Sequence, residues 1–294
     1  MGVRRRTLLG GGGGLAAVLA GCARVDPPKD PMTSETTPSA TASTTPSPLD
    51  TATARPATAS ASATVSSVYA TPLVAPAFVP PLLPATRGAI PHGVSITELP
   101  VPGPYLAWTI DDGTDPDVIA GYVEMAHLTG NRFTFFLNGN QKAWSIRADM
   151  LRPLVQTGQI QLANHTWSHR DLRALSTKGI QDELRWNEDF IQATYGVSGR
   201  PFFRPPYGYV NAHVRDAAAE IGYTASTLWY GSLADSGRLT PEQIRGFGDE
   251  WFTAGRIVIA HANYPPILSA MQHLIDLIAQ RGLRTVTLND VFAV

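Results

Sequence analysis

Beyond about residue 93, short β-rich apolar runs alternate with longer segments whose apolar residues recur at helical spacing. The short runs predict strands at residues 105–111, 132–138, 159–165, 201–204, 223–229, 256–261 and 284–288. The longer segments predict helices at residues 117–128, 180–195, 212–221, 241–252 and 267–279. Repeated strand-helix units favour parallel strands and an α/β fold, for which a barrel and an open sheet are both allowed. About seven units favour a distorted (β/α) barrel.

The segment that precedes this pattern has a different composition. Residues 23–92 are rich in Thr, Ser, Ala and Pro, with few charges in the middle. Such a segment cannot bury enough apolar surface to offset the entropy that it would lose on ordering. We therefore expect a disordered linker at 23–92 and a folded domain at 93–294.

The first 22 residues have the features of an export signal. Arginines at 4–6 precede a weakly apolar stretch at 8–20, which is too short to span a bilayer and fits a signal peptide. Residues 5–9 resemble a twin-arginine signal, and residues 19–22, Leu-Ala-Gly-Cys, resemble a bacterial lipobox. The resemblance implies lipid on Cys22, which would anchor the protein to the outer face of the cell membrane with its domain in the cell wall. The alternative is a buried structural cysteine after an ordinary secretory signal.

Charge and cysteine content exclude two classes of protein. The formal net charge is −1 over 294 residues, and the body of the chain has no basic block of the kind that neutralises nucleic-acid phosphates. We therefore expect no nucleic-acid partner. The single cysteine excludes an intrachain disulfide framework, so core packing must supply the stability. We expect a monomer.

Polar residues gather where the predicted strands end. In parallel α/β folds, the loops after the carboxyl ends of the strands build the active site. Five predicted strands end in polar clusters, at residues 109–113, 165–169, 204–208, 229–235 and 259–261. This clustering marks one edge of the predicted sheet as the candidate site.

Three of these residues form a candidate metal site. His165 and His169 are four residues apart, so both can lie on one face of a helical turn and bind one ion, although most such pairs are surface residues. Asp111 and Asp112 can serve one site only where their strand ends, and Gly113 permits the sharp turn that this requires. Adjacent aspartates also occur in solvated loops and helix caps. Three N/O ligands with open positions describe a catalytic centre, for which Zn²⁺ suits best and Co²⁺ or Ni²⁺ is acceptable.

Proton transfer can be assigned to neighbouring residues. Asp111 would lie beside the ion without binding it and could take a proton from the attacking water. Arg204 offers a rigid guanidinium fork that could orient Asp111. His261 follows the apolar run at 257–259 and could protonate a departing amine. A core histidine is the alternative reading of His261.

Four motifs in order resemble the polysaccharide deacetylase family, also called the NodB-homology group or carbohydrate esterase family four. They are Thr-Ile-Asp-Asp-Gly at 109–113, His-Thr-Trp-Ser-His at 165–169, Arg-Pro-Pro-Tyr-Gly at 204–208 and Ile-Ala-His at 259–261. The resemblance covers residues 105–294. It implies a metal-dependent hydrolase that removes N-acetyl groups from a cell-envelope polysaccharide, such as peptidoglycan or a chitin-like oligomer, and releases acetate. It also implies that the backbone N–H of Tyr207 stabilises the charge on the tetrahedral intermediate.

A further motif departs from the family pattern. The family has two acidic residues followed by Trp, whereas this chain has Ser232 at the first position and Asp235 followed by Ser236. In the family, this region tunes the catalytic histidine and forms the wall of the acetyl pocket, so we assign Asp235 to the catalytic set. Trp229 or Tyr230 could rebuild the wall. The departure keeps two alternatives open, a catalytically weak or inactive glycan-binding lipoprotein and an O-acetyl esterase of the same fold.

Overall fold

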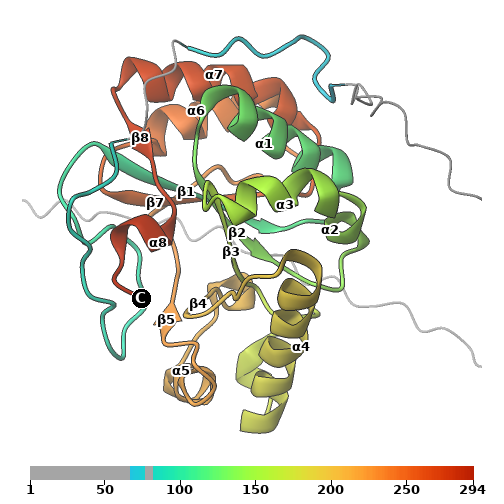
Figure 1. Ribbon diagram of the computed structural model, residues 1–294, viewed down its shortest axis with the longest axis vertical. Helices are drawn as coiled ribbons and strands as arrows, with labels where there is room; N and C mark the ends of the chain where they lie inside the picture. The colour runs from blue at the N-terminus through green and yellow to red at the C-terminus, as the bar shows by residue number, and fades with distance from the viewer. Residues whose placement is uncertain (1–66, 77–81) are drawn as a thin grey trace, which may run out of the picture. The chain divides into compact units, whose positions relative to one another are not determined.

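The computed structural model describes residues 67–76 and 82–294 (Figure 1). The expected signal peptide, the expected lipidation site Cys22 and the expected linker up to residue 66 lie outside these described residues. Within the described part of the chain, no helix combines the length and the apolar character needed to cross a membrane.

A parallel sheet forms the centre of the domain. Its eight strands are β1 (Tyr105–Asp112), β2 (Phe133–Leu137), β3 (Ile160–Asn164), β4 (Phe202–Phe203), β5 (Ala225–Ser226), β6 (Gly231–Ser232), β7 (Arg256–His261) and β8 (Arg284–Thr285). The strand order is β5-β4-β3-β2-β1-β7-β6, and β8 pairs with the start of β1. Every pairing is parallel. With helices around the curled sheet, the fold is the distorted (β/α) barrel that the repeated units predict.

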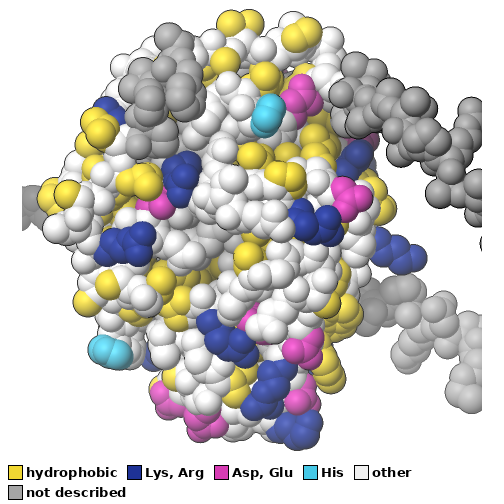
Figure 2. Space-filling model, in the orientation of Figure 1, with side chains coloured by type: hydrophobic (Ala, Val, Ile, Leu, Met, Phe, Trp, Pro, Cys, Tyr) yellow, Lys and Arg dark blue, Asp and Glu magenta, His cyan; other side chains and the backbone are white. Residues whose placement is uncertain are grey.

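Helices cover the outside of the sheet. They are α1 (Pro116–Thr129), α2 (Lys142–Ile146), α3 (Ala148–Gln156), α4 (Thr177–Tyr195), α5 (Ala212–Ala219), α6 (Pro241–Trp251), α7 (Pro266–Gln280) and α8 (Leu288–Val291). In Figure 1, α1, α6 and α7 lie together above the strands, and α4 and α5 lie together at the opposite end of the domain. On the face drawn in Figure 2, basic and acidic side chains are interspersed, which agrees with the near-neutral composition.

Local sequence explains where the main helices begin and end. The Asp115 side chain accepts from the first backbone N–H groups of α1, and Gly130 ends the helix in the left-handed conformation. The α4 helix follows the same scheme with Ser176 and Gly196. Thr240 caps α6 in a capping box. These caps satisfy backbone groups that would otherwise lack partners at the helix ends.

Aromatic packing joins the sheet to the helices. Trp108 of β1 is fully buried and meets Tyr122 of α1, Phe133 of β2 and Phe252 edge-on, with ring centroids 4.9–5.9 Å apart across the cluster. Edge-to-face pairs of this kind contribute about 0.5–1.5 kcal/mol beyond the area that they bury. The core therefore fixes β1, the strand that carries the candidate aspartates.

Some elements differ from the predicted ones. The helical spacing does not predict α2 and α3, because both are short and Pro153 interrupts the pattern inside α3. The strand predicted at 284–288 ends at Thr285, since Thr287 forms a capping box with Asp290 and begins α8. The strand predicted at 223–229 pairs with β4 only over residues 225 and 226, and Thr227 forms an isolated bridge with Ile96.

Residues 67–76 pack on the helix layer. Tyr69 is only 8% exposed, and its hydroxyl donates to the Gly121 carbonyl of α1 at 2.6 Å. The Val74 backbone N–H donates to Gln272 Oε1 of α7 at 2.8 Å, and Gln272 Nε2 donates back to the Val74 carbonyl at 3.1 Å. Among the described residues, Ser67 also contacts the domain, because its hydroxyl donates to Glu124 Oε1 of α1 at 2.6 Å.

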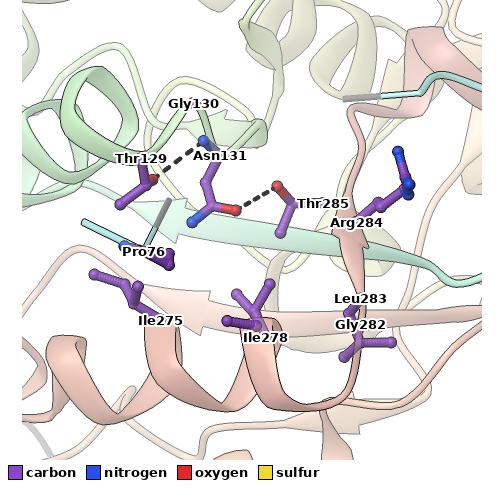
Figure 3. Close-up of a pocket in the computed structure, with 11 residues that line it drawn as sticks. Pro76, Thr129, Gly130, Asn131, Ile275, Ile278, Gly282, Leu283, Arg284 and Thr285 are labelled. Carbon is purple, nitrogen blue, oxygen red and sulfur yellow. Dashed lines mark hydrogen bonds between the residues drawn. The ribbon is translucent and has the colours of Figure 1, made fainter. Parts of the chain in front are cut away.

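A cavity of about 270 Å³ lies next to the end of this segment (Figure 3). Ile275 and Ile278 of α7 line one side, Thr129 and Asn131 line the side across from them, and Pro76 lies next to Ile275. Asn131 lies between Thr129 and Thr285 and is hydrogen-bonded to both. Thr285 belongs to β8, which pairs with the amino end of β1, so this cavity lies away from the carboxyl ends of the strands.

Candidate active site

The carboxyl ends of neighbouring parallel strands bring the polar clusters to one edge. Asp111 of β1 is in register with His261 of β7. On the other side of β1, Asp112 is in register with Leu137 of β2, which in turn is in register with Asn164 of β3. His165 follows that residue directly. Residues far apart in the sequence therefore meet where parallel strands end.

Asp112, His165 and His169 form one compact cluster. One ligand atom from each lies within 4.8 Å of those of the other two. Asp112 Oδ1 is 3.4 Å from His165 Nε2 and 3.5 Å from His169 Nε2. The structure thus brings together the three residues that the sequence assigns to a metal.

Hydrogen bonding prepares these atoms to accept a cation. His165 Nδ1 lies 2.7 Å from the Arg204 carbonyl, which can only accept, so Nδ1 carries the proton and Nε2 offers a lone pair. Asp112 Oδ1 is buried and has no hydrogen-bond partner among the described residues. A buried carboxylate oxygen without a donor, facing two imidazole nitrogens, fits a divalent cation by its donor set.

The charges of the cluster act on each other. Burial opposes ionisation of Asp112, but the close imidazole of His165 outweighs it and lowers the Asp112 pKa well below its usual range. Burial also disfavours protonation of His165, yet Asp111 and Asp112 raise the His165 pKa. Burial and the nearby His165 lower the pKa of His169. An ionised carboxylate next to an unprotonated imidazole is the state that binds a metal.

Arg204 fixes Asp111 beside the cluster. Its Nη1 forms a fully buried ion pair with Asp111 Oδ1, and its Nη2 donates to Thr109 Oγ1 at 2.9 Å. Its Nε donates to the Thr227 carbonyl at 3.2 Å, so the guanidinium plane cannot turn. The other oxygen of Asp111, Oδ2, lies 3.5 Å from His165 Nε2. Arg204 therefore leaves one carboxylate oxygen of Asp111 facing the cluster.

Asp235 holds His261 in a similar way. His261 Nδ1 lies 3.0 Å from Asp235 Oδ1, and the His261 backbone N–H donates to Asp235 Oδ2 at 3.2 Å. Burial favours the neutral imidazole, but the hydrogen bond and charge of Asp235, together with Asp111 and Asp112, raise the His261 pKa. The imidazole is thereby kept protonated to a higher pH than usual, which suits a proton donor.

Tyr207 lies at the open side of the cluster. Its ring centroid is 4.6 Å from that of His169, and its side chain is 58% exposed. Its backbone is left-handed, with φ of 61°, and Gly208 follows with φ of 69°. This turn brings the Tyr207 ring next to a candidate metal ligand.

Comparison with known proteins agrees with this geometry. Residues 98–226 match the family model described as polysaccharide deacetylase. The chain thus carries a polysaccharide deacetylase domain. A chitin deacetylase from Arthroderma benhamiae is 30% identical over 213 residues, which cover 69% of this chain and 55% of that relative. An uncharacterized protein from Streptomyces coelicolor is 29% identical over 191 residues, covering 64% of this chain and 72% of the relative. This polysaccharide deacetylase domain thus spans about half the length of the chitin deacetylase.

Solved structures share the fold of this domain. A carbohydrate esterase family 4 pseudoenzyme from Bacillus anthracis superposes with a TM-score of 0.60 at 19% identity, covering 68% of this chain and 70% of that one. A family 4 carbohydrate esterase from Streptomyces lividans, in complex with acetate, has a TM-score of 0.54 at 24% identity, covering 62% and 91%. These likenesses establish the barrel architecture.

Of the two aromatic residues proposed to rebuild the acetyl wall, Trp229 is the one that lies at the candidate site. A Cβ on Gly208 would come within 2.9 Å of the Trp229 ring, and the Arg204 guanidinium lies 5.7 Å from that ring. Tyr230 instead stacks on Arg256, at 3.6 Å, where β7 begins. The prediction for Tyr230 is wrong, because the chain turns toward the amino end of β7 at that residue.

The sequence patterns do not predict the polar residues of α4 that support the candidate site. Glu183 accepts from the backbone and hydroxyl of Ser168, at 2.8 and 2.6 Å. Asn187 is fully buried and donates to the Leu137 carbonyl and to Asn164 Oδ1, each at 2.8 Å. The signal was present in the sequence, because these two polar residues are four apart on the face that α4 buries.

Proposed function

We propose that the chain is a metal-dependent N-deacetylase that acts on an N-acetylated polysaccharide of the cell envelope and releases acetate. The observation that carries this proposal is the meeting of the Asp112, His165 and His169 cluster with Asp111 and His261 at one strand edge. The match to the polysaccharide deacetylase family model and similarity to a chitin deacetylase support the substrate class, peptidoglycan or chitin-like oligomers.

Asp112, His165 and His169 would hold the cation, for which the donor set favours Zn²⁺ and also suits Co²⁺ or Ni²⁺. When bound, such a cation lowers the pKa of a water from about 15.7 towards ~7 and stabilises negative charge on oxygen. Asp112 supplies the anionic ligand, and the two imidazoles supply neutral nitrogen once His165 loses its proton.

Two fixed side chains would move the protons. Asp111, held by Arg204, takes a proton from the attacking water through the oxygen that faces the cluster. His261, held and kept protonated by Asp235, gives a proton to the amide nitrogen, which must be protonated to leave as an amine. The backbone N–H of Tyr207 is the donor that we assign to the developing oxyanion.

We also propose export and lipid anchoring for the chain. The arginines at 4–6 with the apolar stretch after them, and the lipobox-like run that ends at Cys22, support this proposal. Two or more acyl chains on one residue hold a protein on a membrane stably. A polymeric wall substrate fits a domain at that place better than a cytosolic metabolite does. Metabolic labelling of the expressed protein with a fatty acid tests the proposal, and equal labelling of Cys22→Ala would contradict it.

Acetate release tests the enzymatic proposal. The purified chain should release acetate from N-acetylated chitin oligomers or peptidoglycan fragments, and a chelator should abolish the release. Asp111→Asn should keep the metal and lose about 10²–10⁴-fold in kcat, because the general base is gone. An Asp111→Asn protein with wild-type turnover would overturn the assigned mechanism.

Two other functions are favoured by one observation, Ser232 at the position of the first acidic residue of the departing motif. A glycan-binding protein without turnover would bind the same oligomers and release no acetate, and one neighbour of this fold is described as a pseudoenzyme. An O-acetyl esterase would release acetate from O-acetylated but not from N-acetylated sugars. Parallel assays with both substrate classes therefore separate the three functions.

A further inference from the structure

The loop after β7 contacts the candidate metal ligand of β1. Asn263, two residues beyond His261, donates from Nδ2 to Asp112 Oδ2 at 2.7 Å. Its Oδ1 accepts from the Thr114 backbone N–H at 3.3 Å and from Thr114 Oγ1 at 3.0 Å. Because a backbone N–H can only donate, the amide oxygen must face Thr114, and the amide NH₂ must face the carboxylate. The direction of the hydrogen bond to Asp112 is therefore fixed by its surroundings.

This contact makes the two carboxylate oxygens of Asp112 unequal. Oδ2 is satisfied by Asn263, whereas Oδ1 is buried without a hydrogen-bond partner in the described part of the chain and faces both histidine Nε2 atoms. A carboxylate on a short side chain can still rotate about its last torsion, which is broad. A donor on one oxygen stops that rotation and aims the other oxygen.

We propose that Asn263 is a positioning residue that orients Asp112 for the cation, an inference that rests on the metal centre of the proposed function. Asp112 has left-handed backbone geometry, with φ of 69°, a strained conformation that persists only where its surroundings hold it. The loop after β7 also forms two backbone hydrogen bonds on either side of Asp112. The Ala262 N–H donates to the Asp111 carbonyl at 3.0 Å, and the Asp115 N–H donates to the Ala262 carbonyl at 3.1 Å.

The same loop carries the proton donor. His261 ends β7, and Asn263 follows after a single residue that is bonded to β1. One short segment therefore ties the position of His261 to the orientation of Asp112. Outer contacts of this kind typically change metal affinity about 10–100-fold when they are removed.

A Co²⁺ titration of the metal-free full chain tests the proposal without any substrate. Asn263→Ala should bind Co²⁺ about 10–100-fold more weakly than the wild type and should show a changed visible absorption spectrum, because the carboxylate loses its fixed orientation. Thr114→Ala, which keeps the backbone contact and loses only the Oγ1 contact, should weaken binding in the same direction and by less. If Asn263→Ala fails to fold, Thr114→Ala decides the outcome.

Asn211→Ala is the matched control. Asn211 caps α5, because its Oδ1 accepts from the Val214 N–H at 2.9 Å. Like Asn263→Ala, Asn211→Ala removes a hydrogen bond between an asparagine side chain and a backbone N–H. Asn211→Ala should therefore lower stability without changing Co²⁺ affinity. Wild-type affinity and spectrum in Asn263→Ala would overturn the positioning role while leaving the metal centre in place. A wild-type chain that binds no Co²⁺ or Zn²⁺ would overturn the metal centre itself.

Discussion

At the scale of single residues, backbone strain coincides with the candidate site. Among the described residues, the left-handed non-glycine positions are Asp112, Thr166, His169, Tyr207 and Ala234, with φ between 54° and 69°. Asp112 is the last residue of β1, and the other four lie in loops that follow the carboxyl ends of strands. Each such residue costs on the order of 1–3 kcal/mol and persists only where its surroundings hold it. The fold therefore gives up some stability to direct these side chains toward one another.

The pairing of Asp235 with His261 leads to a prediction about pH. Asp235 raises the His261 pKa, so the protonated donor persists to higher pH. In Asp235→Asn, that charge is lost, the His261 pKa falls, and the donor is deprotonated at lower pH. The alkaline limb of kcat against pH should therefore move to lower pH, as measured by acetate release. Asp249→Asn, which breaks an exposed carboxylate contact with His273, should leave the profile unchanged. An unshifted alkaline limb in Asp235→Asn would exclude His261 as the donor.

The turn after the two aspartates depends on a glycine. Gly113 has φ of 93°, and a Cβ there would lie 2.2 Å from the Trp144 ring, whose Nε1 donates to the Asp112 carbonyl at 2.8 Å. Gly113→Ala should lower the unfolding free energy by at least about 3 kcal/mol, because the added Cβ strains the backbone and overlaps the Trp144 ring. It should also weaken Co²⁺ binding, because both effects displace the neighbouring ligand Asp112. Gly158→Ala, with φ of 72° and open space around it, should cost about 1 kcal/mol and leave Co²⁺ binding unchanged. Urea denaturation and metal titration of the two variants measure the difference, and equal costs would refute the steric argument.

At the scale of elements, α4 supports the histidine loop through polar contacts inside the core. Asn187 joins three segments, since it accepts from the Gly139 N–H at 2.6 Å and donates to Leu137 of β2 and Asn164 of β3. Asn164 Oδ1 in turn accepts from the Thr166 N–H at 2.8 Å, one residue after His165. A fully satisfied network of this kind specifies one arrangement of the loop.

Removing Asn187 should therefore affect both stability and the site. Asn187→Ala leaves buried groups of β2, β3 and the following loop without partners, at a cost of about 3 kcal/mol, because each unsatisfied group costs about 1–3 kcal/mol. Co²⁺ binding should weaken as the loop between the two histidines loosens. Gln181→Ala, which removes the Gln181 hydrogen bonds at the surface of the same helix, should change neither property measurably. If Asn187→Ala is destabilised but keeps wild-type metal affinity, Asn187 of α4 supports only the stability of the fold and not the metal site.

The sequence predicts elements well where the signal is local. The short apolar runs predict β1, β2, β3 and β7 to within one or two residues of their observed bounds, because a buried parallel strand needs a continuous apolar run. It also predicts which residues gather at the carboxyl edge. It does not predict the role of Asn263, which depends on a contact 151 residues away along the chain. The α3 helix is missed for another reason, since Pro153 interrupts its pattern.

At the scale of the whole domain, the site and the N-terminal segment lie on different parts of the molecule. The site occupies the carboxyl ends of β1, β3 and β7, whereas residues 67–76 contact α1 and α7 of the helix layer (Figure 1). The segment before β1 also links the two sides of the sheet, because Ile96 forms a bridge with Thr227 and Glu98 forms one with Arg256. The residues that precede β1 thus help to hold the barrel together.

Tyr69 provides the test of that contribution. Its ring packs beside Gly121 of α1 and Leu268 of α7, and burial raises its pKa, so the hydroxyl stays protonated as a donor. Tyr69→Ala should lower the unfolding free energy by about 3 kcal/mol, and Tyr69→Phe, which loses only the hydrogen bond, should lower it by about 1 kcal/mol. Val74→Ala, at a side chain that is 71% exposed, should have little effect. Co²⁺ affinity should stay at the wild-type value in all three variants, because the contact is remote from the metal cluster. A wild-type denaturation midpoint for Tyr69→Ala would show that the segment from Ser67 adds nothing to the stability of the barrel.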